Sequence, residues 1–330
     1  MASCDSRTVR TAGVVLLMLL AGAAEVRGQE DPALTANECC LQLLIPMGAR
    51  ALGMGQALSA RPGSDVVFVN PAGLGAVTDT RFLVYTSETV VSRTTVLGAA
   101  FGIEEIGTFG VTYRLIDYGE SDVTDQTGNV IGNLAIFDQS LSAVFAAPLA
   151  AGLRAGLTYK LYQFSRECSG SCGVAGFSAT THMVDAGVQY TPGRIPALEL
   201  GVSLLHVGFP LQVVNAEQSS STPARVRLGA AYEALHLVRP ESPFELRLAV
   251  DVEDRAGGPG QALVNFGAEL SLEDDLRLWV GRAGGETLTS GTSLGVGINY
   301  DRFEFGAAKS FSNVAGGSAQ PVHFSFSVRL

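Results

Sequence analysis

The amino-acid sequence predicts an all-β fold, a transmembrane antiparallel β-barrel of about fourteen strands. Three observations lead to this prediction. Apolar and polar residues alternate with period two in segments that recur along residues 81–330. The connections between these segments alternate between short and long, which is the layout of an outer-membrane barrel. An N-terminal apolar run has the features of an export signal.

The composition excludes two broad classes of protein. Hydrophobic residues make up 47% of the chain, which argues against an intrinsically disordered protein. The net charge is −10 with only 22 Lys and Arg residues, so a nucleic-acid partner, which needs clustered positive charge, is not expected. Charged residues account for only 16% of the chain, where a soluble domain has about 25%.

Residues 1–28 are expected to be a cleaved signal peptide. Arg7 and Arg10 precede an apolar run over residues 13–24, which is too short for a membrane-spanning helix of roughly 20 residues. Cleavage after Ala24 or Gly28 fits the small residues at these positions. No later uncharged apolar run reaches the roughly 18 residues of a membrane-spanning helix, so a helical membrane protein is excluded.

The alternation is clearest in residues 244–253, FELRLAVDVE. Phe244, Leu246 and Leu248 lie on one face of the expected strand. Glu245 and Arg247 lie on the other, because successive side chains of a strand point to opposite faces. The segments expected to form strands are residues 81–91, 94–104, 106–119, 134–147, 152–166, 177–191, 197–208, 223–236, 243–254, 260–272, 275–284, 291–300, 302–312 and 320–330.

Alternation alone does not separate a membrane barrel from a soluble sandwich. A sandwich buries its apolar face, whereas a membrane barrel turns that face to lipid and lines its lumen with the polar face. The export signal, a strand number that suits closure and the alternating final strand favour the barrel. We therefore expect the mature chain in the outer membrane of a Gram-negative-type bacterium, surrounded by its lipid. A secreted β-sandwich or propeller is the alternative.

One segment before the first strand carries a family resemblance. Residues 48–74 read GARALGMGQALSARPGSDVVFVNPAGL and resemble the N-terminal signature of the PorV/PorQ family of outer-membrane proteins, which are FadL-like barrels. Weaker matches follow at residues 156–160, 185–187, 223–229, 267–269 and 279–282, so the resemblance covers almost the whole mature chain. The sequence departs from the family at Leu330, where the family usually ends in Phe, and at Gln56, where glycine is common.

The resemblance implies that residues 29–80 form a plug or hatch inside the barrel and that residues 81–330 form its wall. The plug motif would consist of Gly48, Arg50, Gly53, Met54, Gly55, Asp65, Asn70, Pro71, Ala72 and Gly73. Asn70 can form a local Asx-type hydrogen bond, Pro71 fixes φ, and the glycines permit close backbone approach. On the residues alone, an ordinary turn leading into the first strand is the simpler interpretation.

Other residues offer little chemistry. Cys168 and Cys172 flank three residues of a long connection, and in an oxidising compartment we expect a disulfide between them, with two free thiols as the alternative. The four histidines are dispersed and no nucleophile motif occurs, so we predict no metal, no cofactor and no enzymatic activity. The acidic residues 251, 253 and 254 could bind calcium, although a solvated strand end is preferred. Ion pairs are expected among the lumen-facing residues Arg154, Lys160, Arg225, Arg227, Glu233, Glu245, Arg247, Asp251 and Glu269.

Two functions follow from the resemblance. The first is a non-enzymatic component of a type IX-like secretion system, which receives secreted cargo and presents it to a surface attachment complex. Its contacts would come from the loops at residues 120–133, 167–176, 209–222 and 255–259. The alternative is a FadL-like channel for hydrophobic small molecules, guided by the plug and by a lateral opening in the wall. Kinks or bulges at Gly98, Gly102, Gly107 and Gly110 would favour this channel.

Overall fold

The computed structural model describes residues 38–89, 92–173, 176–213, 219–235, 242–258, 260, 262–273, 275–285, 291–311 and 322–330. The chain divides into residues 1–30 and residues 31–330, and the second unit is described below. The predicted signal peptide lies outside the described residues. No helix within these ranges is long and apolar enough to cross a membrane.

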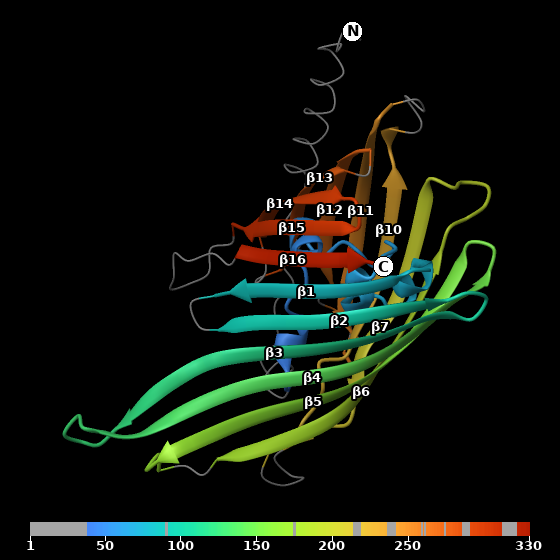
Figure 1. Ribbon diagram of the computed structural model, residues 1–330. Helices are drawn as coiled ribbons and strands as arrows, with labels where there is room; N and C mark the ends of the chain where they lie inside the picture. Colours follow the sequence, from blue (N-terminus) through green and yellow to red (C-terminus); the bar gives the residue numbers. More distant parts are fainter. Residues whose placement is uncertain are drawn as a thin grey trace, which may run out of the picture. The chain divides into compact units, whose positions relative to one another are not determined.

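Fourteen strands of the described chain close into one antiparallel barrel (Figure 1), in the order β1-β16-β15-β14-β13-β12-β11-β10-β7-β6-β5-β4-β3-β2. Each of the fourteen segments predicted from alternation matches one of these strands, so the predicted fold class is confirmed. Their bounds are β1 (Thr80–Glu88), β2 (Arg93–Ile103), β3 (Gly107–Thr124), β4 (Val130–Ala150), β5 (Leu153–Gly170), β6 (Phe177–Tyr190), β7 (Leu198–Gly208), β10 (Arg225–Glu233), β11 (Phe244–Arg255), β12 (Leu263–Leu272), β13 (Leu276–Ala283), β14 (Gly291–Tyr300), β15 (Phe303–Ser310) and β16 (Val322–Arg329).

Three strands extend beyond their predicted segments. β3, β4 and β5 have 18, 21 and 18 residues, so the predicted loop 120–133 is mostly strand. It reverses at a tight turn in which an Asp125 carboxylate oxygen accepts the N–H groups of Thr127 and Asn129 at 2.8 and 2.9 Å. Hydrogen bonds from the side chains of these two residues lower the pKa of Asp125.

The predicted loop 209–222 also contains secondary structure. Its described part forms the small hairpin of β8 (Leu211–Gln212) and β9 (Ser219–Ser220). Glu38 forms an isolated parallel bridge with Ser221 just after this hairpin. The connection is therefore held against the N-terminal part of the described chain.

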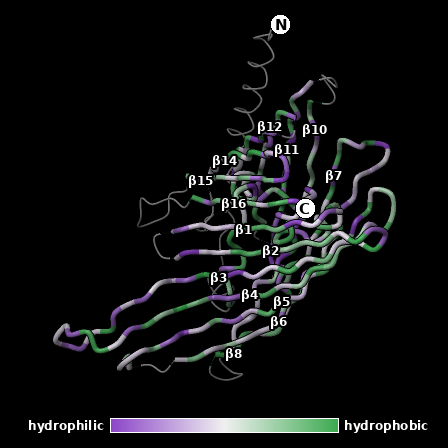
Figure 2. The backbone as a smooth tube through the Cα atoms, viewed as in Figure 1, coloured by the Kyte–Doolittle hydropathy of each residue, from purple (hydrophilic) through white to green (hydrophobic). Residues whose placement is uncertain are grey.

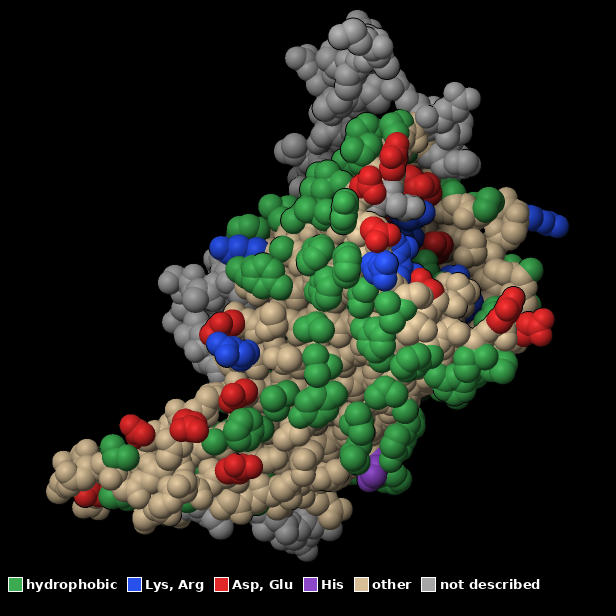
Figure 3. Space-filling model, viewed as in Figure 1, with side chains coloured by type: hydrophobic (Ala, Val, Ile, Leu, Met, Phe, Trp, Pro, Cys, Tyr) green, Lys and Arg blue, Asp and Glu red, His purple; other side chains and the backbone are tan. Residues whose placement is uncertain are grey.

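The outward face of the wall is apolar and the inward face is polar. On β6, Val184 and Val188 point outward and are 49% and 43% exposed, whereas Asp185 and Gln189 point inward and are each 1% exposed. Hydrophobic and hydrophilic residues alternate along the strands in Figure 2, and hydrophobic side chains spread over the outside of the wall in Figure 3. This arrangement is that of a membrane barrel and the reverse of a soluble sandwich.

A lateral row of outward-facing residues crosses ten neighbouring strands. Its members are paired one to the next as Leu276, Ile298, Phe305, Phe326, Val84, Leu97, Tyr113, Leu141, Leu161 and His182. Leu276 begins its strand, whereas His182 lies in the half of β6 nearest the long connections. The row thus climbs from one end of the barrel toward the other, because strands of a closed barrel are tilted.

The two ends of the barrel can be told apart. Thr80 and Leu330 lie side by side at one end, where the Leu330 N–H donates to the Thr80 carbonyl at 2.9 Å. The short turns at residues 104–106, 151–152 and 301–302 lie at the same end. Because short turns of outer-membrane barrels face the periplasm, we call this the periplasmic end and the opposite one the outer end.

Strand pairing corrects one expectation about the wall. β1–β2 and β2–β3 pair without a register shift, so the glycines at positions 98, 102, 107 and 110 form no bulge. Register shifts lie elsewhere, near the outer end of the β3–β4 ladder and at the end of the β4–β5 ladder. A further shift lies between β6 and β7, where Val184 pairs with Val207 and Ala186 pairs with Leu204. Two residues of β7 therefore oppose one residue of β6, which is a β-bulge.

Residues 38–79, called the luminal segment below, lie inside the barrel and are blue to cyan in Figure 1. Their helices are η1 (Leu41–Leu44), α3 (Ala49–Gly53), η2 (Asp65–Phe68) and η3 (Pro71–Ala76). A Cβ added to Gly201 would lie 2.1 Å from the Ser59 carbonyl oxygen, and one added to Gly281 would lie 2.0 Å from the Gly55 nitrogen. Eight wall glycines on eight strands would each bring a Cβ within 3.0 Å of this segment; these glycines are Gly102, Gly110, Gly156, Gly187, Gly201, Gly229, Gly267 and Gly281.

Candidate functional site

Asn70 connects the luminal segment to two strands of the wall. Its side-chain oxygen accepts the Ala72 N–H at 3.0 Å and caps η3, which begins at Pro71. Its side-chain nitrogen donates to the carbonyls of Val188 on β6 and Val202 on β7 at 3.2 and 3.3 Å. The side chain is fully buried, so one amide group satisfies backbone from three parts of the chain.

Trp279, the single tryptophan of the chain, packs against α3 of the luminal segment. A Cβ added to Gly53 would lie 2.8 Å from the Trp279 Cβ, and one added to Gly297 would lie 2.7 Å from the far edge of the indole. Met54 is fully buried beside this contact. The indole N–H donates to Glu269 at 2.9 Å, so the ring has a fixed orientation.

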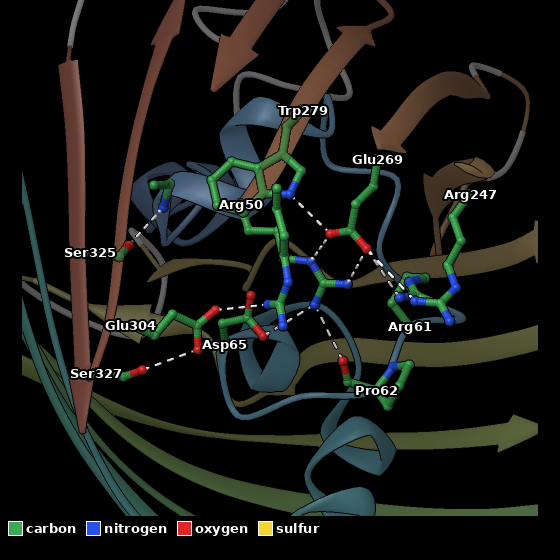
Figure 4. A network of polar contacts seen from close by, with 12 residues as sticks. Arg50, Arg61, Pro62, Asp65, Arg247, Glu269, Trp279, Glu304, Ser325 and Ser327 are labelled. Atoms are coloured by element: carbon green, nitrogen blue, oxygen red, sulfur yellow. Dashed lines mark hydrogen bonds and ion pairs between the residues drawn. The ribbon is translucent and has the colours of Figure 1, made fainter. Parts of the chain in front are cut away.

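A network of buried charges surrounds Glu269 (Figure 4). Arg50 donates to the two carboxylate oxygens of Glu269 at 2.8 and 3.3 Å, and Arg61 donates to one of them at 3.3 Å. Arg50 also pairs with Asp65 at 3.6 Å, and Arg61 pairs with Glu199. The side chains of Arg50, Arg61 and Glu269 are 9%, 4% and 3% exposed. The two cations of the luminal segment thus share one wall carboxylate.

The surroundings shift the pKa values of the two arginines in opposite directions. Burial by itself lowers the pKa of Arg50, but the charges of Glu269 and Asp65 outweigh burial and raise it. Burial and the nearby charge of Arg50 lower the pKa of Arg61. Both guanidinium groups remain charged at physiological pH, so the network is held by ion pairs rather than by neutral hydrogen bonds.

Asp251 anchors a second point of the luminal segment. One of its carboxylate oxygens accepts the backbone N–H groups of Leu58 and Ser59 at 3.2 and 2.9 Å and the Ser59 hydroxyl at 2.5 Å. Glu253, two positions along β11, pairs with Arg227. Both acids are buried in the lumen, so the expectation of a solvated strand end is wrong for them. Within the described ranges, no three His, Cys, Asp or Glu side chains could hold a metal ion.

The outer half of the lumen contains an apolar cluster. Its buried members are Cys40, Leu43, Tyr162, Ala179, Met183 and Leu211, with Cys39, Phe164 and Phe177 packed against them. We call this set the outer cluster. It joins the beginning of the luminal segment to β5, β6 and β8, and it includes a disulfide between the adjacent Cys39 and Cys40. The outer cluster is thus a packed apolar and aromatic region inside the lumen.

A polar group borders the outer cluster. Tyr118 and Tyr162 both donate their hydroxyls to the buried carboxylate of Asp138. Arg114 is 4% exposed and donates from Nη1 to the Gln42 carbonyl at 3.1 Å. Its Nε and Nη2 have no hydrogen-bond partner among the described residues. These two nitrogen atoms of Arg114 can therefore donate hydrogen bonds to an acceptor group that reaches the outer cluster.

A triad of buried side chains, formed by Lys160, Asp185 and His206, lies at the β6–β7 bulge. Asp185 on β6 accepts the His206 backbone N–H at 2.8 Å and pairs with Lys160 at 2.5 Å. The Lys160 ammonium also lies 3.0 Å from the His206 imidazole. His206 has a φ of 58°, a conformation that is uncommon for residues other than glycine. The triad thus fixes an irregular backbone next to the outer cluster.

The periplasmic half of the lumen is polar and partly hollow. A cavity of about 390 Å³ lies between the luminal segment and the wall, and its lining includes Arg50, Asp65, Trp279, Glu304 and Ser325. Figure 4 shows the charged side chains of this region pointing toward one another. Its lining mixes carboxylates, guanidinium groups and hydroxyls, in contrast to the outer cluster.

The ten residues of the predicted plug motif all lie on the luminal segment, where Arg50, Asp65 and Asn70 make the polar contacts described above. Within the expected set of lumen residues, Arg247 pairs with Glu233 and Glu245. Lys160 and Glu269 pair with Asp185 and Arg50, which were not in that set. Cys168 and Cys172 form a disulfide with an S–S distance of 2.02 Å near the outer end of β5, apart from the lumen contacts. Sequence reasoning missed Arg61 and Glu199. A second arginine in an otherwise small and apolar segment was the available signal for Arg61.

Comparison with known proteins finds similarity of fold alone. No family model and no curated protein matches the sequence. The Pseudomonas putida toluene transporter TodX matches with a TM-score of 0.57 at 12% identity, over 86% of this chain and 98% of that chain. CymD, a monoaromatic hydrocarbon channel, gives 0.52 at 13% identity over 87% and 97%. A Pseudomonas aeruginosa FadL homologue gives 0.51 at 10% identity over 86% and 98%. The chain therefore shares its fold with FadL-like outer-membrane barrels.

Proposed function

We propose that the protein is an outer-membrane channel that passes hydrophobic small molecules without converting them. The observation that carries this proposal is the outer cluster, a group of apolar and aromatic side chains in the outer half of the lumen. The periplasmic half contains buried ion pairs instead. A hydrophobic molecule would therefore be held at the outer cluster and rejected by the polar half.

The β6–β7 bulge gives such a molecule a route that avoids the polar half. The β6–β7 ladder ends at Met183 and Gly208, and Met183 belongs to the outer cluster. Beyond Gly208 the chain turns inward, and Leu211 of β8 joins the same cluster. A molecule held there would leave sideways between β6 and the hairpin of β8 and β9. This exit would require the 3.1 Å hydrogen bond from the Phe209 N–H to the His182 carbonyl to open.

The comparisons support the channel over the alternative function. The solved structures of this fold include a toluene transporter and monoaromatic hydrocarbon channels. The secretion function rests on the resemblance of residues 48–74 to PorV/PorQ proteins, and no matching sequence relative adds to it. Cargo and an attachment complex therefore remain predictions, and the channel is our proposal.

Uptake by cells with matched variants tests the proposal. Leu211→Gln places a polar amide in the outer cluster, and Leu83→Gln places the same amide at an inward position of β1 that lines the periplasmic cavity. We expect Leu211→Gln to slow toluene uptake several-fold and Leu83→Gln to leave it unchanged. Heat-modifiable electrophoretic mobility verifies that both barrels fold.

The result also decides between the two functions. Cells that lack the gene should take up toluene slowly and keep a normal set of surface proteins. Normal uptake together with missing surface proteins would overturn the channel and favour secretion. Slowed uptake in Leu83→Gln alone would instead place the route through the periplasmic cavity.

A further inference from the structure

We infer that the outward face of the wall carries a binding site for a phosphate group of an outer-leaflet lipid, formed by Arg282 and Lys309 together with Thr292 and Phe311. The site lies on the lipid side of β13, β14 and β15. It is separate from the lumen and does not depend on what passes through it.

The four residues are neighbours on adjacent strands. Arg282 pairs with Thr292, and the Phe311 N–H donates to the Thr292 carbonyl at 2.7 Å. Lys309 lies two residues before Phe311 and pairs with Leu294. Two strand spacings and an offset of two residues along the strands separate Arg282 from Lys309, which amounts to roughly 12 Å. Both long side chains can therefore reach one headgroup.

The two cations lie at the outer limit of the apolar wall. Arg282 and Lys309 are each the last but one residue of their strand at the outer end. Leu294 beside them is an exposed, outward-facing apolar residue, whereas Ala308 next to Lys309 points inward and is buried. A cation on the lipid face costs far less near the interface than at the membrane midplane. These positions therefore suit the level of the headgroups.

The Lys309 side chain is directed away from the apolar wall. Its ammonium lies 5.8 Å from the centre of the Phe311 ring, which follows the end of β15. This is how a long cationic side chain reaches from apolar surroundings toward a polar interface. The charge is thereby presented next to Thr292 and Arg282.

The charges of the site are not neutralised by the described protein. Neither Arg282 nor Lys309 forms an ion pair with another described residue, whereas Arg93 at the outer end of β2 pairs with Glu88 at 3.2 Å. Unpaired cations at the headgroup level attract anionic lipid. The arginine fork matches two phosphate oxygens, and lysine adds a point charge. A lipid phosphate is therefore the ligand that this chemistry recognises.

The test uses the full chain purified in detergent, with diphosphorylated lipid A as the probe and its dephosphorylated form as the comparison. Native mass spectrometry measures the lipid bound to the wild type, to the double variant R282Q/K309Q and to the control R93Q. We expect the wild type to prefer the phosphorylated lipid and each lost cation to weaken its binding about tenfold. The control should bind as the wild type does.

Three results would overturn the proposal. Equal binding of both lipids by the wild type would show that phosphate is not recognised. An equal loss of binding in R93Q would show a general effect of charge. Displacement of the bound lipid by inorganic phosphate would identify a site for free anions instead of lipid. Unchanged heat-modifiable mobility verifies that each variant is folded.

Discussion

Arg50 and Glu269 are 219 positions apart in the sequence, yet the Arg50 Nε lies 2.8 Å from a Glu269 carboxylate oxygen inside the barrel. Arg50 belongs to α3 of the luminal segment and Glu269 to β12 of the wall. The pair is buried, so removing either partner leaves the buried network with an unbalanced charge, although Arg50 keeps Asp65 and Glu269 keeps Arg61. The attachment of the luminal segment to the wall is therefore sensitive to single substitutions.

Glu269→Gln should strongly destabilise the barrel. The amide keeps the shape of the side chain but leaves Arg50 and Arg61 without their shared carboxylate, which costs about 3–5 kcal/mol at a buried pair. Unfolding by denaturant in lipid vesicles measures the change. Glu304→Gln is the control, because Glu304 is 33% exposed and pairs with Arg277 at 2.9 Å. A loss below about 1 kcal/mol is expected there, and equal losses in both variants would contradict the prediction.

Gly297→Val should displace the Trp279 indole. The added atoms would begin 2.7 Å from the ring edge, and overpacking of this kind typically costs about 1–3 kcal/mol. Because Trp279 is the single tryptophan, its fluorescence reports this site directly, and we expect emission at longer wavelengths. Gly193→Ala, which meets nothing within 4 Å, should leave the spectrum unchanged. An unaltered spectrum in Gly297→Val would refute the packing described here.

Asn70→Asp should destabilise the protein more than Asn70→Ala. Aspartate can still accept the Ala72 N–H, but it loses the nitrogen that donates to Ser59, Val188 and Val202. A carboxylate would then face three carbonyl oxygens in a buried site. Thermal unfolding of both variants measures the difference. If aspartate is tolerated better than alanine, the cap of η3 is the dominant contact and the donated bonds matter little.

Arg114→Met should change which molecules the channel prefers. The free donors of Arg114 border the outer cluster, so an oxygen-bearing aromatic can form a hydrogen bond that toluene cannot. We expect the variant to lose up to about tenfold of the uptake of benzyl alcohol relative to toluene. Lys309→Met on the outer surface is the control. An unchanged ratio in Arg114→Met would mean that ligands do not reach this guanidinium.

Strand positions could be predicted from the sequence because each strand of the wall faces lipid on one side and the lumen on the other. Alternate residues such as Val184 and Asp185 must suit lipid and lumen in turn, and that requirement leaves a period of two. The extensions of β3 to β5 could not be predicted in this way. In the added outer residues of β3 and β5, 120–124 and 167–170, polar residues occur on both faces. In those of β4, Val130 and Ile131 are neighbouring exposed apolar residues, so the alternation disappears there too.

Only one part of the candidate site, the luminal segment, could be predicted from the sequence. Residues of the luminal segment are contiguous, so a local motif marks them, and the resemblance supplied their place in the lumen. Their partners on the wall depend on the strand registers and on where the segment crosses each strand. Arg61 and Glu199 are 138 positions apart, and no local pattern connects them. The β6–β7 bulge was missed because an extra residue in one strand leaves no mark in composition.

The ring of wall glycines has a consequence for the order of assembly. Atoms of the luminal segment occupy space that a Cβ would fill on eight strands, so the finished barrel has no free passage along which the segment could be threaded. It must already be enclosed when β1 and β16 join to complete the circle. Residues 81–330 supplied separately should therefore fail to capture a peptide of residues 38–79. The luminal segment would thus be the template around which the wall assembles.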